Sequence, residues 1–459
     1  MDRLPRGFWW VLAFGAVAAA YLPGVGRGFI KDDFAWIAGS RFAGALGWLE
    51  PFRRHNGFYR PLVSLSFAAD ERLFGLEPLG YGLTNLALVG AGMALIVLLA
   101  RVLGMAWPWG LLAAGLWGLN PHGIASGVLW ISGRTSLLLT AFALAAGIAF
   151  AAGRAGWAAL ACLLALLCKE EAVLLPAVLA AWAVLLPADG ASRTRALARR
   201  GAILLLPLAA YLLLRSRTAA YLPWSAPGFY RPTLSPAALA RNALEYADRA
   251  CTLAAAAVLL ASALLGRWPR PDARERRWLA LGLIWLAGGY GLTVFLPVRS
   301  SLYAVFPSAG AALAAAALGH AAWRAAPPAR RRRVLLTAAL APLALVPLLW
   351  SRNARLVRTA RLSARALAAI AAQREGLAAG RLLVLHDAPD ARPNLASAFG
   401  TLLPEAVRLA TGLPDARAWL EPPPPDWQAA GLQPPAGEPR VELGLLQGDV
   451  RPLHGGPGP

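Results

Sequence analysis

Long apolar runs, separated by short segments rich in arginine, glycine and proline, dominate the first 350 positions of the chain. A run of about 17 to 25 apolar residues is long enough to cross a bilayer as a helix. Eleven runs, several of them at or below the short end of this range, predict eleven membrane-spanning helices. The predicted spans lie near 8–23, 84–100, 108–122, 135–152, 155–168, 172–187, 201–214, 250–266, 278–296, 303–320 and 334–350.

The arginines between these runs predict the orientation. With the N-terminus in the cytoplasm, most of them fall in cytoplasmic loops, whereas each short outer turn carries one basic residue: Arg134, Lys169 or Arg299. Basic loops stay on the cytoplasmic side of a membrane. We therefore predict a cytoplasmic N-terminus and place the residues after 350 outside. The first span lacks the small-x-small exit of a cleaved signal peptide, so we expect it to stay as an anchor.

Composition narrows the class of protein. With 58% hydrophobic and 15% charged residues in 459, the chain is neither disordered nor a soluble single domain. Its three cysteines lie in or beside apolar stretches without a CxxC spacing, which indicates packing. A net charge of +21 on a soluble protein would suggest nucleic acid, but here topology and contact with membrane lipids explain it. No nucleotide-binding glycine motif is present.

Two adjacent carboxylates, Asp32 and Asp33, follow the first span directly, after Lys31. Partial burial at the membrane edge raises the pKa of a carboxylate, and a second carboxylate raises it further, which makes one of them a better general base. In an extended backbone the two side chains diverge, so that one can face a substrate and the other a hydrogen-bond donor or a metal. A solvated turn is the alternative.

The segment 58–73 has apolar residues at steps of three or four, which predicts a helix with one apolar face. Either this helix lies flat on the outer leaflet, or it packs within the loop. In the next outer turn Arg134 can pair with a phosphate oxygen. His122 is either a ligand or base, or simply a hydrogen-bonded histidine at the interface.

The turn Lys169-Glu170-Glu171 has two interpretations as well. It forms a salt-bridged cap, or Lys169 binds a phosphate while an acid holds the ammonium in place. Lys31 and Lys169 are the only lysines among 45 basic residues. Either a compact ammonium group is required at these two positions, or the presence of lysine there is chance.

Beyond residue 350 the pattern changes. An arginine-rich helix over 352–374 is expected to lie along the outer leaflet. A strand at 382–387 and a helix at 395–409 predict a small α/β unit. We expect a transmembrane domain over 1–350, this unit over 351–430, and a disordered tail rich in proline and glycine over 431–459.

The order of these pieces resembles the GT-C superfamily of membrane glycosyltransferases. Within it, the chain is similar to the transmembrane O-mannosyltransferase-like proteins that carry tetratricopeptide repeats in animals, in their repeat-free bacterial form. The resemblance covers about 8–186 well and 278–320 moderately. It departs from the family pattern at Gly82 and Val298, where the family has a histidine and an acid. The matching residues are Asp32-Asp33, Tyr59-Arg60-Pro61-Leu62, Gly80-Tyr81, Leu83-Thr84-Asn85, Trp130-Ile131-Ser132-Gly133-Arg134, Lys169-Glu170 and, more faintly, Arg299 and Leu302-Tyr303.

The resemblance implies an all-α, polytopic protein of the bacterial inner membrane, with outer amphipathic helices and a small C-terminal α/β soluble domain. It implies a polyprenyl-phosphate sugar as donor, of hexosyl or mannosyl type, a protein or glycan as acceptor, and Asp32 or Asp33 as base. No cofactor is certain, and a divalent metal is left open. The donor phosphate is expected at Arg134, Lys169 and Arg299. Supporting roles are expected for Lys31, Tyr59, Arg60, His122, Glu170 and Tyr303.

In this mechanism the acceptor hydroxyl loses its proton to the aspartate as it attacks the anomeric carbon with inversion, and the cations stabilise the departing phosphate. The alternatives are a transporter or flippase of lipid-linked sugars, and a catalytically inactive assembly subunit. Transporters place ionisable groups near the bilayer midplane. The charges of this chain are predicted at the edges of the spans, which favours transfer.

Overall fold

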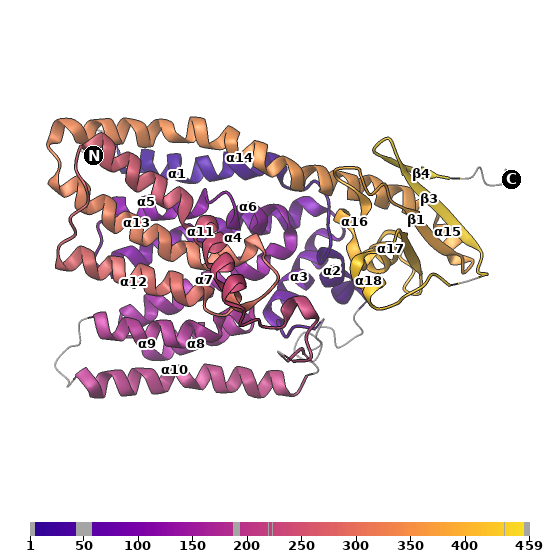
Figure 1. Ribbon diagram of the computed structural model, residues 1–459, viewed down its shortest axis with the longest axis horizontal. Helices are drawn as coiled ribbons and strands as arrows, with labels where there is room; N and C mark the ends of the chain where they lie inside the picture. The colour runs from indigo at the N-terminus through magenta and orange to yellow at the C-terminus, as the bar shows by residue number, and fades with distance from the viewer. Residues whose placement is uncertain are drawn as a thin grey trace.

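The computed structural model describes residues 5–42, 57–186, 193–218, 220–222, 224–435 and 437–453. Roughly parallel helices form a bundle along the long axis of the molecule, and a small sheet lies beyond one end of it (Figure 1). The bundle contains α1 (Arg6–Tyr21), α4 (Pro78–Val102), α5 (Trp107–Gly118), α7 (Arg134–Ala151), α8 (Ala155–Leu166), α9 (Leu175–Leu185), α10 (Arg193–Ser216), α11 (Pro236–Leu265), α12 (Ala273–Tyr290), α13 (Val305–Ala325) and α14 (Pro328–Ala371).

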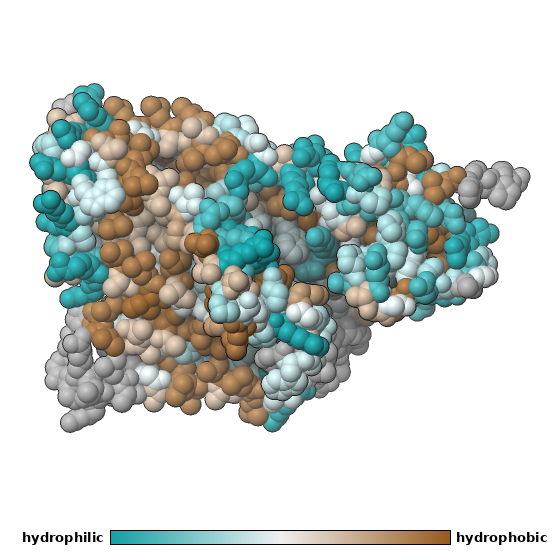
Figure 2. Space-filling model, viewed as in Figure 1, coloured by the Kyte–Doolittle hydropathy of each residue, from teal (hydrophilic) through white to brown (hydrophobic). Residues whose placement is uncertain are grey.

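Each predicted span falls on one of these helices. Within the described ranges, six segments are long and apolar enough to cross a membrane: Arg6–Gly24, Pro78–Val102, Ile131–Ala151, Pro236–Leu265, Ser301–Ala325 and Pro328–Ala371. A band of hydrophobic side chains covers the bundle, with hydrophilic residues at both of its ends (Figure 2). The chain is therefore a multi-pass membrane protein. Eleven crossings, and the side that each end faces, stay predictions.

The middle of the bundle is built from small residues. The part of α13 that would lie within a membrane is almost entirely buried, and it crosses α12 at a pair of glycines. A Cβ on Gly310 would come 2.4 Å from the carbonyl oxygen of Gly282. Only glycine at this crossing lets the two backbones approach so closely.

Three short helices close the end of the bundle that carries the sheet: α2 (Asp33–Arg41), α3 (Pro61–Phe74) and α6 (Gly123–Leu129). Helix α3 corresponds to the predicted amphipathic segment. It buries Val63 and Phe67 and packs against α2 and α4, so its apolar face is used for packing within the loop.

We expected the arginine-rich segment after the last span to be a separate helix lying along the leaflet, and this expectation was wrong. The segment continues α14 without a break to Ala371 and leads straight from the bundle to the sheet (Figure 1). The physical reason is visible in the sequence. Residues 348–371 contain neither glycine nor proline, so nothing ends the helix where the apolar run ends.

The C-terminal unit is a small α/β layer, as predicted. Its sheet has the order β2-β1-β3-β4, in which β1 runs parallel to β2 and β3, and β4 runs antiparallel to β3. One face of the sheet packs on α14 and α17. The strands are β1 (Leu382–His386), β2 (Ala418–Glu421), β3 (Arg440–Leu446) and β4 (Asp449–Pro452), and the helices around them are α15 (Arg374–Ala378), α16 (Leu395–Ala398), α17 (Leu403–Thr411) and α18 (Pro425–Ala429).

Two expectations about this unit need correction. The helix expected over 395–409 is divided into α16 and α17 at Gly400, whose φ is 53°. The tail expected to be disordered supplies β3 and β4, so the unit extends to residue 452. Val441, Leu443 and Leu445, at alternate positions of β3, pack on the common core, and the proline and glycine around them partly conceal this strand pattern in the sequence.

Candidate active site

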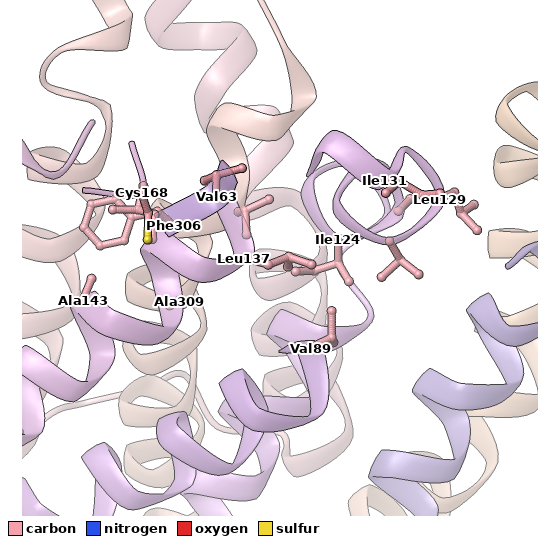
Figure 3. Packing of buried hydrophobic residues seen from close by; sticks show 14 of the residues in the cluster. Val63, Val89, Ile124, Leu129, Ile131, Leu137, Ala143, Cys168, Phe306 and Ala309 are labelled. Carbon is pink, nitrogen blue, oxygen red and sulfur yellow. The ribbon is translucent and has the colours of Figure 1, made fainter. Parts of the chain in front are cut away.

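The turns that were predicted to lie outside meet at the end of the bundle that carries the C-terminal unit (Figure 1). The backbone N–H of Lys31 donates to the carbonyl oxygen of Ala398 in that unit (2.8 Å). The turn that contains Lys169 rests on apolar packing, since the preceding Cys168 belongs to the same buried cluster as Val63 and Phe306 (Figure 3). Apolar packing thus fixes the positions from which the polar side chains emerge.

Asp33 is completely buried, and protein donors occupy both of its oxygens. Its Oδ1 accepts hydrogen bonds from the backbone N–H (2.7 Å) and the hydroxyl (2.5 Å) of Ser132, and its Oδ2 accepts one from the N–H of Ile30 (2.8 Å). Burial raises the pKa of Asp33 to about 7, with a further contribution from the charge of Asp32, while these hydrogen bonds lower it. Asp33 thus ties the loop after α1 to the turn before α7.

Asp32 differs from its neighbour. Its side chain is exposed, and it makes no capping hydrogen bond to α2. The protein around it nevertheless displaces enough water to raise its pKa, while the charges of Arg60 and Lys31 act in the opposite direction. The two side chains therefore diverge, one towards a hydrogen-bond donor and one outward.

Arg60, at the start of α3, links this loop to the turn between α8 and α9. Its Nη2 donates to Glu170 Oε2 at 2.8 Å, and its Nε donates to the same carboxylate. Burial alone would raise the pKa of Glu170, but Arg60 holds it below its ordinary value. Arg215 lies 3.7 Å from Glu170 on the other side.

Lys169 and Glu171 form an adjacent, almost fully buried ion pair. The Nζ of Lys169 lies 2.5 Å from Glu171 Oε1, donates to Ser136 Oγ (2.8 Å) and sits 5.0 Å from the centre of the Tyr303 ring. Burial lowers the pKa of Lys169 and raises that of Glu171, and each charge opposes the shift of the other. The second oxygen of Glu171 has no hydrogen-bond partner among the described residues.

Arg134 lies deeper than expected for a phosphate ligand. It is completely buried, and Asp70, Asn85, the carbonyl oxygen of Tyr81 and that of Ser66 accept from its guanidinium at 2.5, 2.9, 3.0 and 3.1 Å. These contacts join α3, α4 and α7.

The remaining predicted residues lie around this cluster. Arg299 is about a quarter exposed and pairs with Glu245 of α11 at 2.6 Å. His122 lies 3.3 Å from Arg352 of α14 and 4.0 Å from Asp248, and its pKa is lowered by burial and by Arg352.

Tyr59 and Tyr303 are the two aromatic residues among the predicted supporting residues. Tyr59 is fully buried, and its hydroxyl has no hydrogen-bond partner within the described part of the chain. Tyr303 is nearly buried and faces Lys169. Within the described ranges, no group of three or more His, Cys, Asp or Glu side chains is arranged to hold a metal ion.

Some residues of the cluster escaped the sequence analysis. Tyr230, in the short turn η5 (Gly228–Tyr230), lies within electrostatic range of both Asp32 and Arg60. Ser132 was part of a matching motif, but its role as donor to Asp33 depends on a contact across 99 positions. Neither residue carried a local signal for its partner.

Comparison with known proteins supports the architecture. No protein-family model and no curated protein matches the sequence. Among solved structures, the chain is similar to ArnT from Cupriavidus metallidurans bound to undecaprenyl phosphate (TM-score 0.50, 15% identity, 96% of this chain and 93% of that one). It is also similar to the apo state of ArnT (TM-score 0.51, 15% identity, the same coverage). The arabinofuranosyltransferase AftD from Mycobacteria matches with a TM-score of 0.47 and 17% identity, over 83% of this chain and 29% of AftD. Because the likeness to ArnT extends over nearly the whole of both chains, the protein shares the fold of ArnT, in agreement with the GT-C-like fold expected from the sequence.

Proposed function

We propose that the protein is a glycosyltransferase that moves a sugar from a polyprenyl-phosphate donor to an acceptor hydroxyl on the outer side of the membrane, with inversion. The observation that carries the proposal is the meeting of Asp32, Arg60 and Lys169, from three separate turns, at one end of a GT-C bundle. A lipid phosphate lies at the headgroup level, so the residues that act on it belong at an end of the bundle rather than at its middle.

Asp32 is the better base of the two aspartates. A general base needs a free lone pair within reach of the acceptor, and a pKa closer to neutral than that of an ordinary carboxylate. Asp32 is exposed and its pKa is raised. Asp33 has a raised pKa as well, but its oxygens are already occupied by Ser132 and Ile30, so we assign it to positioning the loop.

We assign the donor phosphate to Lys169 and Arg60 because each keeps a donor beyond its contacts with the described residues. Lys169 uses two of its three N–H groups, on Glu171 and Ser136, and Arg60 uses Nε and Nη2 but not Nη1. Both are paired with carboxylates, Glu171 and Glu170, that hold them in position. Arg299 has the accessible surface for a phosphate contact at the edge of the site. Arg134 has its donors occupied by protein, so in this proposal it holds α3 and α7 together and does not touch the donor. The undecaprenyl phosphate bound to ArnT supports a donor of this lipid class.

The chemistry is a single displacement. The acceptor oxygen forms a bond to the anomeric carbon while the bond from that carbon to the phosphate oxygen breaks. The hydroxyl proton passes to Asp32, and the polyprenyl phosphate leaves with the bonding electrons. Lys169 and Arg60 stabilise the negative charge that builds up on the departing oxygen. We propose a hexose, mannose in the first instance, as the sugar, and a protein or glycan hydroxyl as the acceptor.

The test is transfer of labelled sugar from undecaprenyl-phosphate mannose, and from the corresponding pentose donors, in membranes that contain the full chain. Asp32→Asn should lower kcat by about 10²–10⁴. Asp390→Asn, which changes an exposed aspartate of the C-terminal unit, is the matched control and should leave kcat unchanged. Wild-type transfer by Asp32→Asn would remove the base assignment. Movement of the lipid-linked sugar across the bilayer without transfer would replace the proposal by a flippase.

A further inference from the structure

The C-terminal unit contains a pocket of about 320 Å³. It lies beside β2, the edge strand of the sheet, and against the segment that runs through α18. Its volume is at the lower limit of the range found for small-molecule sites. The residues that line it and matter here are Trp419, Glu421, Pro423, Gln428, Leu432 and Gln433.

The lining combines hydrogen-bonding groups of both kinds with apolar surface. Glu421 supplies a carboxylate, and Gln428 and Gln433 supply carboxamides. The Nε2 of Gln428 already donates to the carbonyl oxygen of Pro423 at 2.6 Å, which leaves its second N–H and its oxygen for a ligand. None of the lining residues is basic. A ligand with many hydroxyl groups and no charge suits this lining, because hydroxyls both donate and accept, whereas an anion would find no cation.

The carboxylate of Glu421 is held in place rather than free to swing. The indole Nε1 of Trp419 donates to Glu421 Oε2 at 3.0 Å, which leaves Oε1 available. Trp419 itself is fixed by stacking on Trp427, with ring centres 4.9 Å apart and planes 28° apart. Aromatic support beside an oriented acceptor is the arrangement that fits a sugar ring, which has both apolar C–H faces and hydroxyl edges.

The position of the pocket in the sheet points to ligand binding as well. Glu421 is the last residue of β2 and lies in register with His386, the last residue of the parallel strand β1. In open α/β sheets, ligands bind outside the carboxyl ends of the parallel strands.

This unit is attached to the loop that carries Asp32. Phe399 stacks on Phe34 of α2 with ring centres 5.5 Å apart, and Ala398 accepts the hydrogen bond from Lys31. Helix α17 packs on α2, and Figure 1 shows α17 and α18 on the side of the unit that faces the bundle. The unit that contains the pocket therefore packs directly against the loop that carries Asp32.

We propose that this pocket binds a neutral carbohydrate, through Glu421, Gln428 and Gln433, and that it holds the part of a glycan acceptor distant from the reacting hydroxyl. The binding of carbohydrate stands on the pocket alone. Its assignment to the acceptor rests on the proposed function.

Binding is measured by saturation-transfer NMR on the full chain, in a detergent without a sugar headgroup, with mannotriose, maltotriose and arabinotriose as probes. At least one of them should bind saturably, and inorganic phosphate should not compete. Gln428→Ala, an exposed position that leaves the core intact, and Glu421→Ala should each weaken binding about tenfold or more. Glu375→Ala, at an exposed residue of α15, is the control. No saturable binding of any probe, or wild-type affinity in both pocket variants, would overturn the carbohydrate site.

The acceptor role has its own readout. With a glycan acceptor in the transfer assay, Gln428→Ala should raise KM for the acceptor at unchanged kcat, and an unchanged KM would remove that role. Asp32→Asn should bind the probes like the wild type. Probe binding by a wild-type protein that transfers no sugar would leave the pocket standing and refute the proposed function instead.

Discussion

Replacing Asp33 by asparagine tests the distinction between the two aspartates. Asp33 receives three hydrogen bonds on two oxygens: two from Ser132 and one from Ile30. An asparagine has one oxygen, so in either orientation its NH₂ group faces a buried backbone N–H, that of Ser132 or that of Ile30. A buried donor left without a partner costs about 1–3 kcal/mol. At pH 5 the carboxyl of Asp33, with a pKa of about 7, is protonated, but its hydroxyl oxygen can still accept a hydrogen bond from a backbone N–H, whereas the NH₂ group of asparagine cannot. We therefore expect Asp33→Asn to lower the free energy of unfolding by that amount at pH 5.

The pH dependence has a defined sign. Burial raises the pKa of Asp33 to about 7 from an ordinary 3.8, so between these values the folded state binds more protons than the unfolded state. The stability contributed by Asp33 is therefore full at low pH and falls as the pH rises, by a few kcal/mol in total. The asparagine does not titrate. The deficit of the variant relative to the wild type should therefore shrink between pH 5 and pH 8.

The assay is unfolding in mixed micelles with a denaturing detergent, at pH 5 and pH 8. Asp32→Asn is the matched comparison: its exposed carboxylate makes no capping hydrogen bond, so at pH 5 it should lower the free energy of unfolding by less than Asp33→Asn does. If Asp33→Asn is as stable as the wild type at pH 5, or if Asp32→Asn is the destabilised variant, the assignment of the two aspartates is wrong.

Three further outcomes are expected. Because Asp32 must be ionised to act as base, the rate of transfer should fall on acidification, with a midpoint above the usual carboxylate pKa of about 4. Lys31→Gln removes a charge that lowers the pKa of Asp32, so it should move this midpoint to higher pH, and an unchanged midpoint would contradict the assignment. Lys169→Ala should destabilise the protein by about 3–5 kcal/mol because it leaves Glu171 buried and unpaired, and adding Glu171→Gln should recover part of the loss; strictly additive losses would exclude the pairing. Ending the chain before 440–452 should make the C-terminal unit sensitive to limited proteolysis, because β1 loses its partner β3, whereas ending it after residue 453 should not; equal resistance would contradict the sheet.

Local composition and pattern predict much of this architecture. A bilayer accepts only apolar helices or closed barrels, so run length alone predicted where the helices lie, and each of the eleven intervals falls on one. The strand at 382–386 and the α/β character of the C-terminal unit also followed from local pattern. So did the candidate residues themselves, because charged side chains beside membrane spans are few.

The tertiary structure decided which contacts those residues make. Asp32 and Asp33 are indistinguishable in sequence, and they differ only because Ser132, far along the chain, faces one of them. The sequence predicted that Arg134 binds a phosphate, but it gave no sign that Asp70, 64 positions earlier, would accept a hydrogen bond from its guanidinium. The absence of glycine and proline from residues 348–371 indicates that α14 is continuous, but the direction in which it leaves the bundle depends on its packing against the C-terminal unit. Local pattern determines which segments are helix or strand. Hydrogen bonds and ion pairs between distant segments determine which polar groups are occupied by other parts of the protein and which stay free to contact a ligand.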